Sequence, residues 1–260
     1  MDKSGFTTAL RTLTLIPCPG KESEEMPNSL PWFPVVGLFL GLIIYGMASM
    51  WAVLPFSSWP AGGALFMVAA EIWLTRGLHL DGLADWADSI GGGIDREKRL
   101  AIMRDVSLGA FGVLALIVAL MAKWIAFERL LCSGSAVWVI AIFILSRCMM
   151  VELITSLPYA RAGEGMGRAF VAGASRKHRI ASHLLCLFLC LPFGPPGLGL
   201  FGLALLQTRL FALRVRDRFG GITGDLLGTA NEMVEISLLL ICAWPGGVIL
   251  SYSGWDWVFS

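Results

Sequence analysis

The chain has 260 residues, of which 56% are hydrophobic and only 15% are charged. Soluble globular domains carry charge on about 25% of their residues, so this composition excludes an ordinary soluble protein and predicts an integral membrane protein. The 20 Lys and Arg residues nearly balance the 19 Asp and Glu residues, so the net charge of +1 gives no reason to expect a nucleic-acid partner. The six cysteines include no CxxC pair, and we expect neither a disulfide nor a zinc site.

The N-terminal stretch is expected to lie on the membrane rather than to cross it. Residues 1–16 can form an amphipathic helix at the interface, with Leu10 and Leu13 on one side. Pro17 and Pro19 are expected to end this helix. No small-residue cleavage pattern follows, so a removable signal peptide is not expected.

Apolar segments separated by turns and polar loops predict an all-α, polytopic membrane bundle of about seven transmembrane helices. The segments are residues 35–54, 61–74, 108–127, 136–157, 180–191, 197–211 and 226–250. The fifth and sixth are short and are expected to form a helical hairpin. The second spans only about 21 Å, less than the hydrocarbon core, so we expect its helix to continue into the acidic stretch that follows.

Lys and Arg are unevenly distributed among the loops. The loops after the second, fourth and sixth segments contain nearly all of them, whereas the turns after the first, third and fifth contain almost none. Because basic loops stay on the cytoplasmic side, this pattern predicts that the N-terminus lies inside and the C-terminus outside.

An acidic stretch at residues 77–88 follows the second segment. On a helix, Asp81, Asp85 and Asp88 fall within an arc of roughly 60°. Carboxylates this close repel one another and raise each other's pKa unless a cation lies among them, which favours a divalent metal site. The alternative is an ordinary solvated polar face, and the position at the glycine-rich end of a membrane segment favours the metal.

A second acidic group occurs at the start of the last segment. Asp225 and Glu232 lie about 20° apart on a helix and Glu235 within roughly 80°, so all three share one face. The glycines in residues 220–224 allow helices to approach closely and leave N–H groups open to phosphate oxygens. The alternative stays open that these glycines only form a loop and that Asp225 is an acid favoured by the helix dipole.

Cationic residues on the same side can neutralise the outer oxygens of a pyrophosphate. They are Arg96, Arg99, Arg104, Arg161 and Arg168. For any single arginine, the positive-inside topology is a sufficient explanation. His79 can contact a phosphate or relay a proton, or it can be a structural hydrogen-bonding residue.

Ionisable residues inside apolar segments are costly unless they are paired or functional. Arg147 and Glu152 lie within the fourth segment, and we expect Arg147 to pair with Glu71 of the second. Lys123 is expected to snorkel from the outer end of its helix.

Seven motifs occur in a fixed order along the chain: Leu15-Ile-Pro-Cys-Pro, Trp32-Phe-Pro-Val-Val-Gly, Gly77-Leu-His-Leu-Asp-Gly-Leu-Ala-Asp, Ile102-Met-Arg-Asp105 with Gly109-Ala-Phe-Gly112, Ser146-Arg147, Tyr159-Ala-Arg161 and Gly220-Gly-Ile-Thr-Gly-Asp225-Leu-Leu-Gly. Together they resemble the cobalamin synthase family, adenosylcobinamide-GDP ribazoletransferase. The likeness covers nearly the whole chain, and the combination is specific whereas single motifs are not. Arg76, Trp86 and Ser89 depart from the family pattern, which favours Gly, a small polar residue and Gly there.

The resemblance implies transfer of the adenosylcobinamide phosphate group of adenosylcobinamide-GDP to a ribose hydroxyl of α-ribazole or α-ribazole 5′-phosphate. The products are adenosylcobalamin or its 5′-phosphate and GMP, and Mg²⁺ is required. We expect residues 1–260 to form one membrane-embedded catalytic domain in the inner (cytoplasmic) membrane, in contact with the lipid bilayer. The active site is expected to face the cytoplasm, and a homo-oligomer is compatible with this reading.

Residue roles follow from the resemblance together with the chemistry of phosphoryl transfer. Three carboxylates are expected to bind Mg²⁺, those of Asp81, Asp85 and Asp225. The general base is expected to be Asp88 or Glu232. The expected substrate-binding residues are His79, Arg99, Arg104 and Arg161.

Two other functions fit parts of the pattern. A CDP-alcohol phosphotransferase of lipid synthesis also uses acids at membrane helix ends, but its Asp-Gly-x-x-Ala-Arg signature is incomplete, because Asp81-Gly82 is followed by Leu83-Ala84-Asp85-Trp86. A cation transporter would place its carboxylates at mid-membrane on broken helices, whereas these acids lie at helix ends beside basic loops.

Overall fold

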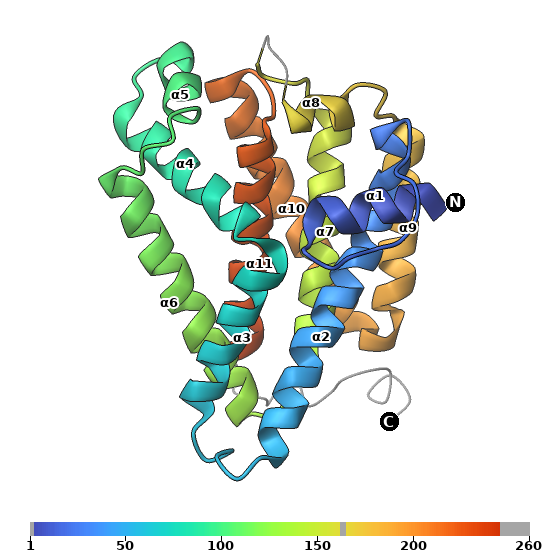
Figure 1. Ribbon diagram of the computed structural model, residues 1–260, viewed down its shortest axis with the longest axis vertical. Helices are drawn as coiled ribbons and strands as arrows, with labels where there is room; N and C mark the ends of the chain where they lie inside the picture. The colour runs from blue at the N-terminus through green and yellow to red at the C-terminus, as the bar shows by residue number, and fades with distance from the viewer. Residues whose placement is uncertain (1–2, 162–164, 245–260) are drawn as a thin grey trace.

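The computed structural model describes residues 3–161 and 165–244. Within these ranges the chain is helical and has no β-strand; a single parallel bridge pairs Tyr159 with Ile222. The predicted class, an all-α polytopic membrane bundle, is confirmed (Figure 1).

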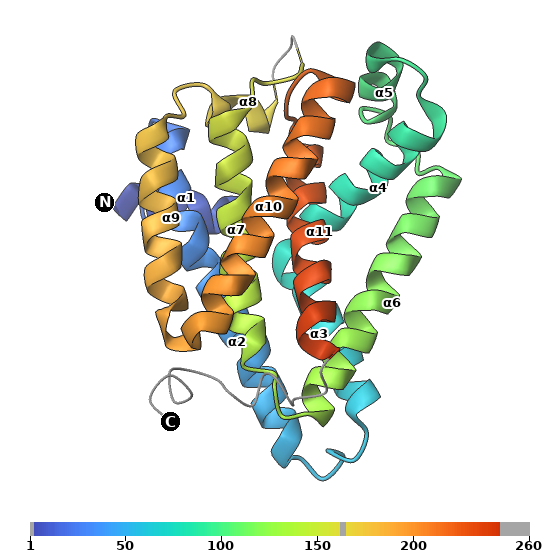
Figure 2. The same cartoon turned by 180° about the vertical axis from the view of Figure 1, so that it is seen from behind.

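The helices in chain order are α1 (Lys3–Leu13), η1 (Met26–Trp32), α2 (Phe33–Val53), α3 (Pro60–Thr75), α4 (Leu78–Gly92), α5 (Arg96–Ile102), α6 (Ala110–Cys132), α7 (Trp138–Ser156), α8 (Met166–Val171), α9 (Arg176–Cys190), η2 (Leu191–Phe193), α10 (Gly194–Phe219) and α11 (Gly224–Ala243). Helices η1 and η2 are 3-10 helices. Every apolar segment predicted from the sequence coincides with a helix, and α9 and α10 form the predicted hairpin (Figure 2).

Five helical stretches are long and apolar enough to cross a membrane: Met26–Val53, Ala110–Cys132, Trp138–Ser156, Arg176–Phe219 and Gly224–Ala243. Helix α3 is apolar but shorter. The number of crossings therefore stays a prediction. The end of the last predicted segment, after residue 244, lies outside the described residues.

Helix α7 forms the centre of the bundle. Every residue from Trp138 to Ile154 is buried, as expected for a helix that is apolar on all sides. Helix α2 packs tightly against α7 through Gly37 and Gly41, whose spacing is that of a GxxxG helix contact. A Cβ atom at Gly41 would lie 2.7 Å from the Cα atom of Ile140. Helix α6, by contrast, exposes large apolar side chains that suit contact with lipid, among them Phe111, Leu114, Val118 and Met121.

Helix α1 lies crosswise to α2 and α7 (Figure 1). Leu10 and Leu13 are only 6% and 1% exposed, so the predicted apolar side of this helix packs against protein. The helix ends at Leu13, and the prediction that Pro17 ends it is wrong. The hydroxyl of Thr14 donates to the carbonyl of Leu10 (2.7 Å) at the true end.

Helix α3 does not continue into the acidic stretch, and this prediction is also wrong. Arg76 and Gly77 both adopt left-handed conformations, with φ values of 57° and 63°. Two such residues in succession end a right-handed helix, and α4 starts in a new direction after them (Figure 1). The conformation at Arg76 is unusual for a residue with a side chain, and its guanidinium donates to the carbonyl of Arg11 (3.1 Å).

The basic loops gather at one end of the bundle. Figure 1 shows α5, α8 and the connection between α10 and α11 at one end, and the α2–α3, α6–α7 and α9–α10 connections at the other. The loops that contain nearly all of the Lys and Arg residues therefore share one side. Which side faces the cytoplasm stays a prediction.

The Gly41→Ala variant tests the packing of α2 on α7. We expect it to unfold with a free energy lowered by about 1–3 kcal/mol, because the added methyl group meets backbone that cannot rotate away. Gly46→Ala on the same helix is the matched control, since a Cβ there meets nothing within 4 Å. It should be neutral or stabilising by up to about 1 kcal/mol. Equal thermal unfolding midpoints in detergent for the two variants would contradict the prediction.

Candidate active site

Helices α4 and α11 cross at close range and bring two acidic groups together. A Cβ atom at Gly82 of α4 would lie 2.9 Å from the Cα atom of Asp225, and one at Gly228 of α11 would lie 3.1 Å from that of His79. The hydroxyl of Thr229 is within hydrogen-bond distance of the carbonyl oxygens of Gly82 (2.9 Å) and Asp225 (2.8 Å). The two glycines therefore allow the helices to approach closely, and the hydrogen bond of Thr229 to Gly82 holds them together.

A short backbone pairing places an arginine against Asp225. The N–H of Ile222 donates to the carbonyl of Pro158 (2.8 Å), and the N–H of Ala160 donates to that of Ile222 (2.9 Å). This pairing carries the chain to Arg161, whose Nη2 lies 2.6 Å from Oδ2 of Asp225. The motifs at residues 158–161 and 220–225, far apart in the sequence, thus form one corner of the site.

The carboxylates of Asp81 and Asp85 lie beside this corner. Burial raises the pKa of Asp85 to about 7, and repulsion by Asp225 and Asp81 contributes to the increase, while Arg161 opposes it. The two helices therefore hold more negative charge than Arg161 neutralises. Such an excess of carboxylate charge is the property that a cation-binding site needs.

Asp88 has a structural contact that the sequence did not predict. Its Oδ2 and Oδ1 atoms accept the backbone N–H groups of Gly109 and Gly112, each at 2.8 Å. These N–H groups start α6 and have no partner within the helix, and a negative charge at that position is favoured by the helix dipole. Asp88 therefore caps α6 and ties it to α4.

Glu232 and Glu235 lie in a separate buried cluster around Lys123. The Nζ atom of Lys123 is 2.7 Å from Oε2 of Glu232 and 2.7 Å from Oε1 of Glu235, and it also contacts Glu71. The oxygens of the three glutamates come within 4.8 Å of one another, the spacing of a metal site, but Lys123 is the cation they surround. Arg147 pairs with Glu235 from the other side.

This cluster corrects three predictions. Lys123 does not snorkel, because its side chain is 1% exposed and lies inside the bundle. Arg147 pairs with Glu235 and not with Glu71, which pairs with Lys123 instead. The structure also does not bring Glu232 to the acids of α4, because its carboxylate is engaged with Lys123.

Four of the five predicted arginines divide into two groups, and the fifth, Arg168, lies on α8. Arg96 donates to the carbonyl of Ala160 (3.1 Å), and Arg99 donates to those of Gly93 (3.1 Å) and Ile94 (3.3 Å), so both hold loops in place. Arg104 and Arg161 reach the acids: Arg104 shares a cavity with Asp81 and Asp85, and Arg161 contacts Asp225. Glu152 is paired, as expected for an ionisable residue in that segment, with Arg209 (3.2 Å).

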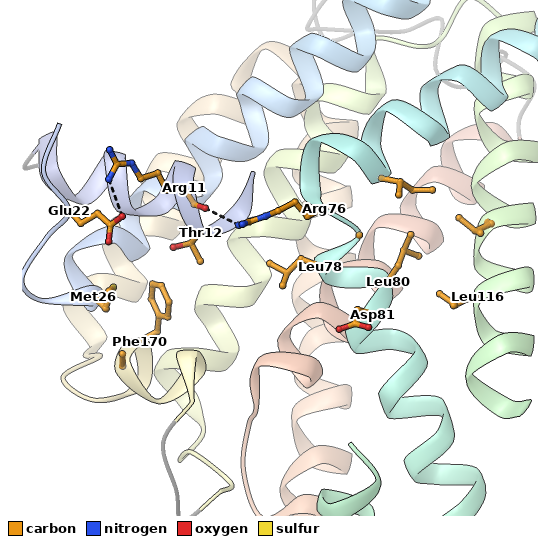
Figure 3. Close-up of a pocket in the computed structure, with 14 residues that line it drawn as sticks. Arg11, Thr12, Glu22, Met26, Arg76, Leu78, Leu80, Asp81, Leu116 and Phe170 are labelled. Carbon is orange, nitrogen blue, oxygen red and sulfur yellow. Dashed lines mark hydrogen bonds and ion pairs between the residues drawn. The ribbon is translucent and has the colours of Figure 1, made fainter. Parts of the chain in front are cut away.

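A large cavity, about 1010 Å³, opens beside Asp81. Figure 3 shows Leu80 and Leu116 on one side of it, and Arg11 and Arg76 on the other. One wall is therefore apolar, and the other combines Arg76 and the Arg11–Glu22 ion pair with the apolar side chains of Met26 and Phe170.

Two smaller cavities also reach Asp81. One, about 360 Å³, is lined by Asp85 and Arg104. The other, about 110 Å³, is lined by His79 and Asp225 among mostly apolar side chains. Asp81 thus lies where three spaces meet, which is the geometry expected for a centre that acts on more than one large molecule.

Two buried polar side chains in this region have no hydrogen-bond partner among the described residues: both ring nitrogens of His79, and both amide atoms of Asn231. Burial lowers the pKa of His79 to about 3, and the charge of Arg147 acts in the same direction, so the ring is neutral. Sequence reasoning missed Asn231; a polar amide within an apolar segment was the feature that could have identified it.

A helical membrane bundle in which arginines lie beside carboxylates that line cavities is the arrangement of a membrane-embedded enzyme for anionic substrates. A family model described as Cobalamin-5-phosphate synthase matches residues 5–243, and the chain belongs to this family. It is therefore an enzyme, a transferase of cobalamin biosynthesis, which confirms the family predicted from the motifs.

Relatives named adenosylcobinamide-GDP ribazoletransferase match along almost their whole length. The protein of Chlorobium phaeobacteroides (strain BS1) is 42% identical over 252 residues, which cover 95% of this chain and 98% of the relative. That of Chlorobium chlorochromatii (strain CaD3) is 42% identical over 250 residues, covering 95% and 96%. That of Syntrophobacter fumaroxidans (strain DSM 10017 / MPOB) is 38% identical over 250 residues, covering 92% and 98%. No solved structure matches the chain.

Two Asp→Asn variants on α4 distinguish the helix-capping role of Asp88 from the charge repulsion at Asp85. Asp88→Asn should lower the free energy of unfolding by about 1–2 kcal/mol, because the amide NH₂ cannot accept from the second N–H group. Asp85→Asn, the same chemical change on the same helix, should leave stability unchanged or increased, since it removes a charge that burial and its neighbours disfavour. Thermal unfolding in detergent without divalent cations measures both. A larger loss for Asp85→Asn would overturn the assignment.

Proposed function

We propose that this enzyme transfers the adenosylcobinamide phosphate group of adenosylcobinamide-GDP to a ribose hydroxyl of α-ribazole or α-ribazole 5′-phosphate and releases GMP. The names of the relatives support the substrates. The observation that carries the chemistry is that Asp81 lines three cavities, one shared with Asp85 and another with Asp225, and that the three carboxylates repel one another.

The acidic group fits Mg²⁺. Magnesium prefers oxygen ligands and is commonly held by one or two carboxylates together with substrate phosphates and water. We assign this role to Asp81 and Asp225, which come from the two crossing helices. When bound, the ion neutralises charge on the bridging and leaving oxygens of the diphosphate.

The transfer forms one bond and breaks one. The ribose hydroxyl oxygen attacks the phosphorus atom that carries the cobinamide ester, and the bond from that phosphorus to the bridging oxygen breaks, so GMP leaves with the bridging oxygen. A carboxylate takes the hydroxyl proton. We propose Asp85 for this role, because a pKa near 7 suits proton transfer at neutral pH, whereas Asp88 is bonded to α6 and Glu232 to Lys123.

The cavities suggest where the corrinoid substrate binds. The space of about 1010 Å³ is the largest beside Asp81, and its apolar wall suits the face of a macrocycle. Arg104 and Arg161 lie where they can neutralise the outer oxygens of the diphosphate. Arg99, also predicted to bind substrate, is proposed instead to position the loop, because backbone carbonyls already occupy its guanidinium.

We further propose that the protein lies in the inner membrane with this site facing the cytoplasm. Helix α4, which bears Asp81 and Asp85, runs from the middle of the bundle toward the end where the basic loops lie, and basic loops stay in the cytoplasm (Figure 1). A cation transporter is disfavoured, because the carboxylates inside the bundle surround Lys123 and Arg147 rather than an open path.

Purified protein in liposomes tests the reaction directly. With adenosylcobinamide-GDP, α-ribazole and Mg²⁺, we expect one GMP released for each ribazole-carrying corrinoid formed, and no release with EDTA. Asp81→Asn should lower kcat/KM about 10²- to 10³-fold, most strongly at limiting Mg²⁺. Normal turnover of this variant at low Mg²⁺ would refute the metal assignment. Release of CMP from a CDP-alcohol, without GMP from the corrinoid, would refute the proposed function.

The pH profile tests Asp85 as the base. Its pKa is raised from the ordinary value, so below about pH 7 the carboxyl is protonated and cannot accept a proton. We expect kcat/KM to fall as the pH decreases through a midpoint at or below 7, because a bound cation lowers this pKa. Asp85→Asn should be at least about 10²-fold slower and lose this dependence. An unchanged profile in Asp85→Asn would exclude Asp85 as the base.

A further inference from the structure

The smallest of the three cavities has the properties of a binding pocket for an aromatic ring. It measures about 110 Å³ and lies among α1, α4, α7 and α11. Its apolar wall is formed by Leu13, Phe33, Met150, Ile154 and Leu227. A cavity of about 150 Å³ with similar lining takes up benzene in another protein, so this smaller space holds only one edge of a fused aromatic ring system, and the remainder of the molecule projects out.

His79 supplies the polar group of this pocket. Its side chain is 2% exposed, and neither ring nitrogen has a hydrogen-bond partner among the described residues. A neutral imidazole carries one N–H donor and one acceptor, and leaving them unpaired in the interior is unfavourable. A ligand that offers a complementary ring nitrogen would satisfy the donor.

We propose that this cavity binds the dimethylbenzimidazole base of α-ribazole, with the N–H of His79 donating to the free ring nitrogen. The inference rests on the proposed function and assigns the acceptor's subsite. The base is flat and apolar and has one unsubstituted ring nitrogen, an acceptor. Asp81 and Asp225 line the same cavity, so the ribose attached to the other nitrogen emerges at the acids.

The other parts of the two substrates fit this pocket less well. Guanine presents several donors and acceptors along its edge, and most would be buried unpaired against this apolar wall. The corrin ring is too large for it. Because Asp81 borders both this pocket and the large cavity, the nucleophile and the corrinoid approach the acids from different sides.

An isosteric analogue tests the hydrogen bond. In it, the free ring nitrogen of α-ribazole is replaced by C–H. Wild-type protein should bind α-ribazole about 10-fold more tightly than the analogue, measured by titration calorimetry in detergent. His79→Phe should bind both equally, whereas His79→Asn, which keeps a donor, should retain part of the preference. For each variant, the affinity for α-ribazole is compared with the affinity of the same variant for the analogue. Partial loss of folded protein affects both measurements equally and does not imitate the result. A preference that persists in His79→Phe would overturn the proposal.

Filling the pocket provides a second test that leaves His79 intact. Leu227→Phe should raise KM for α-ribazole at least 10-fold and change KM for adenosylcobinamide-GDP less than 2-fold. Leu120→Phe is the matched control, because Leu120 lines the large cavity and not the small one, and it should show the opposite split. If Leu227→Phe raises only the KM for adenosylcobinamide-GDP, the dimethylbenzimidazole base binds elsewhere. If wild-type protein forms no ribazole-carrying product at all, the proposed function itself fails, which is a distinct result.

Discussion

The close crossing of α4 and α11 is the constraint on which the site depends. Asp81 and Asp85 come from one helix and Asp225 from the other, and they meet because Gly82 lies directly against the backbone at Asp225. A side chain at that position would separate the helices and dilute the negative charge. The contact therefore brings like charges together: burial raises the pKa of Asp85, repulsion by Asp225 and Asp81 adds to the increase, and a bound cation would relieve that repulsion.

The buried charge cluster complements this contact by fixing the rotation of α11. Lys123 of α6 and Arg147 of α7 hold Glu235, and Lys123 also reaches Glu71 of α3. Buried ion pairs add little net stability, because removing both charges from water is costly. Breaking one pair, however, leaves an uncompensated buried charge, so any rotation of α11 that separates Glu235 from its partners is strongly unfavourable. With α11 held by α6 and α7, Asp225 is directed toward α4 instead of toward lipid.

Helical periodicity predicted which acidic residues share a helix face. It did not predict which groups contact those residues or how far along the helix axis each carboxylate lies. It placed Asp81, Asp85 and Asp88 on one arc, yet the N–H groups that bind Asp88 start a helix some twenty residues later. It placed Glu232 on the face of Asp225, yet seven residues correspond to about 10 Å along the helix axis, enough to move a carboxylate from the site into the interior. The left-handed turn at Arg76 was also beyond a sequence reading, because a non-glycine residue rarely adopts it.

That turn explains why the N-terminal helix belongs to the catalytic unit. At this turn α4 leaves the line of α3, and Arg76 and Gly77 of the turn line the large cavity. The break at Arg76 and Gly77 is held by α1 and the segment after it: the carbonyl of Arg11 accepts from the Arg76 guanidinium, and the N–H of Leu15 donates to the carbonyl of Leu74 (2.7 Å). Arg11 and Arg76 then line the cavity that this bend opens (Figure 3). Helix α1 therefore acts on the candidate site through the direction of α4, although it contributes no acid to that site.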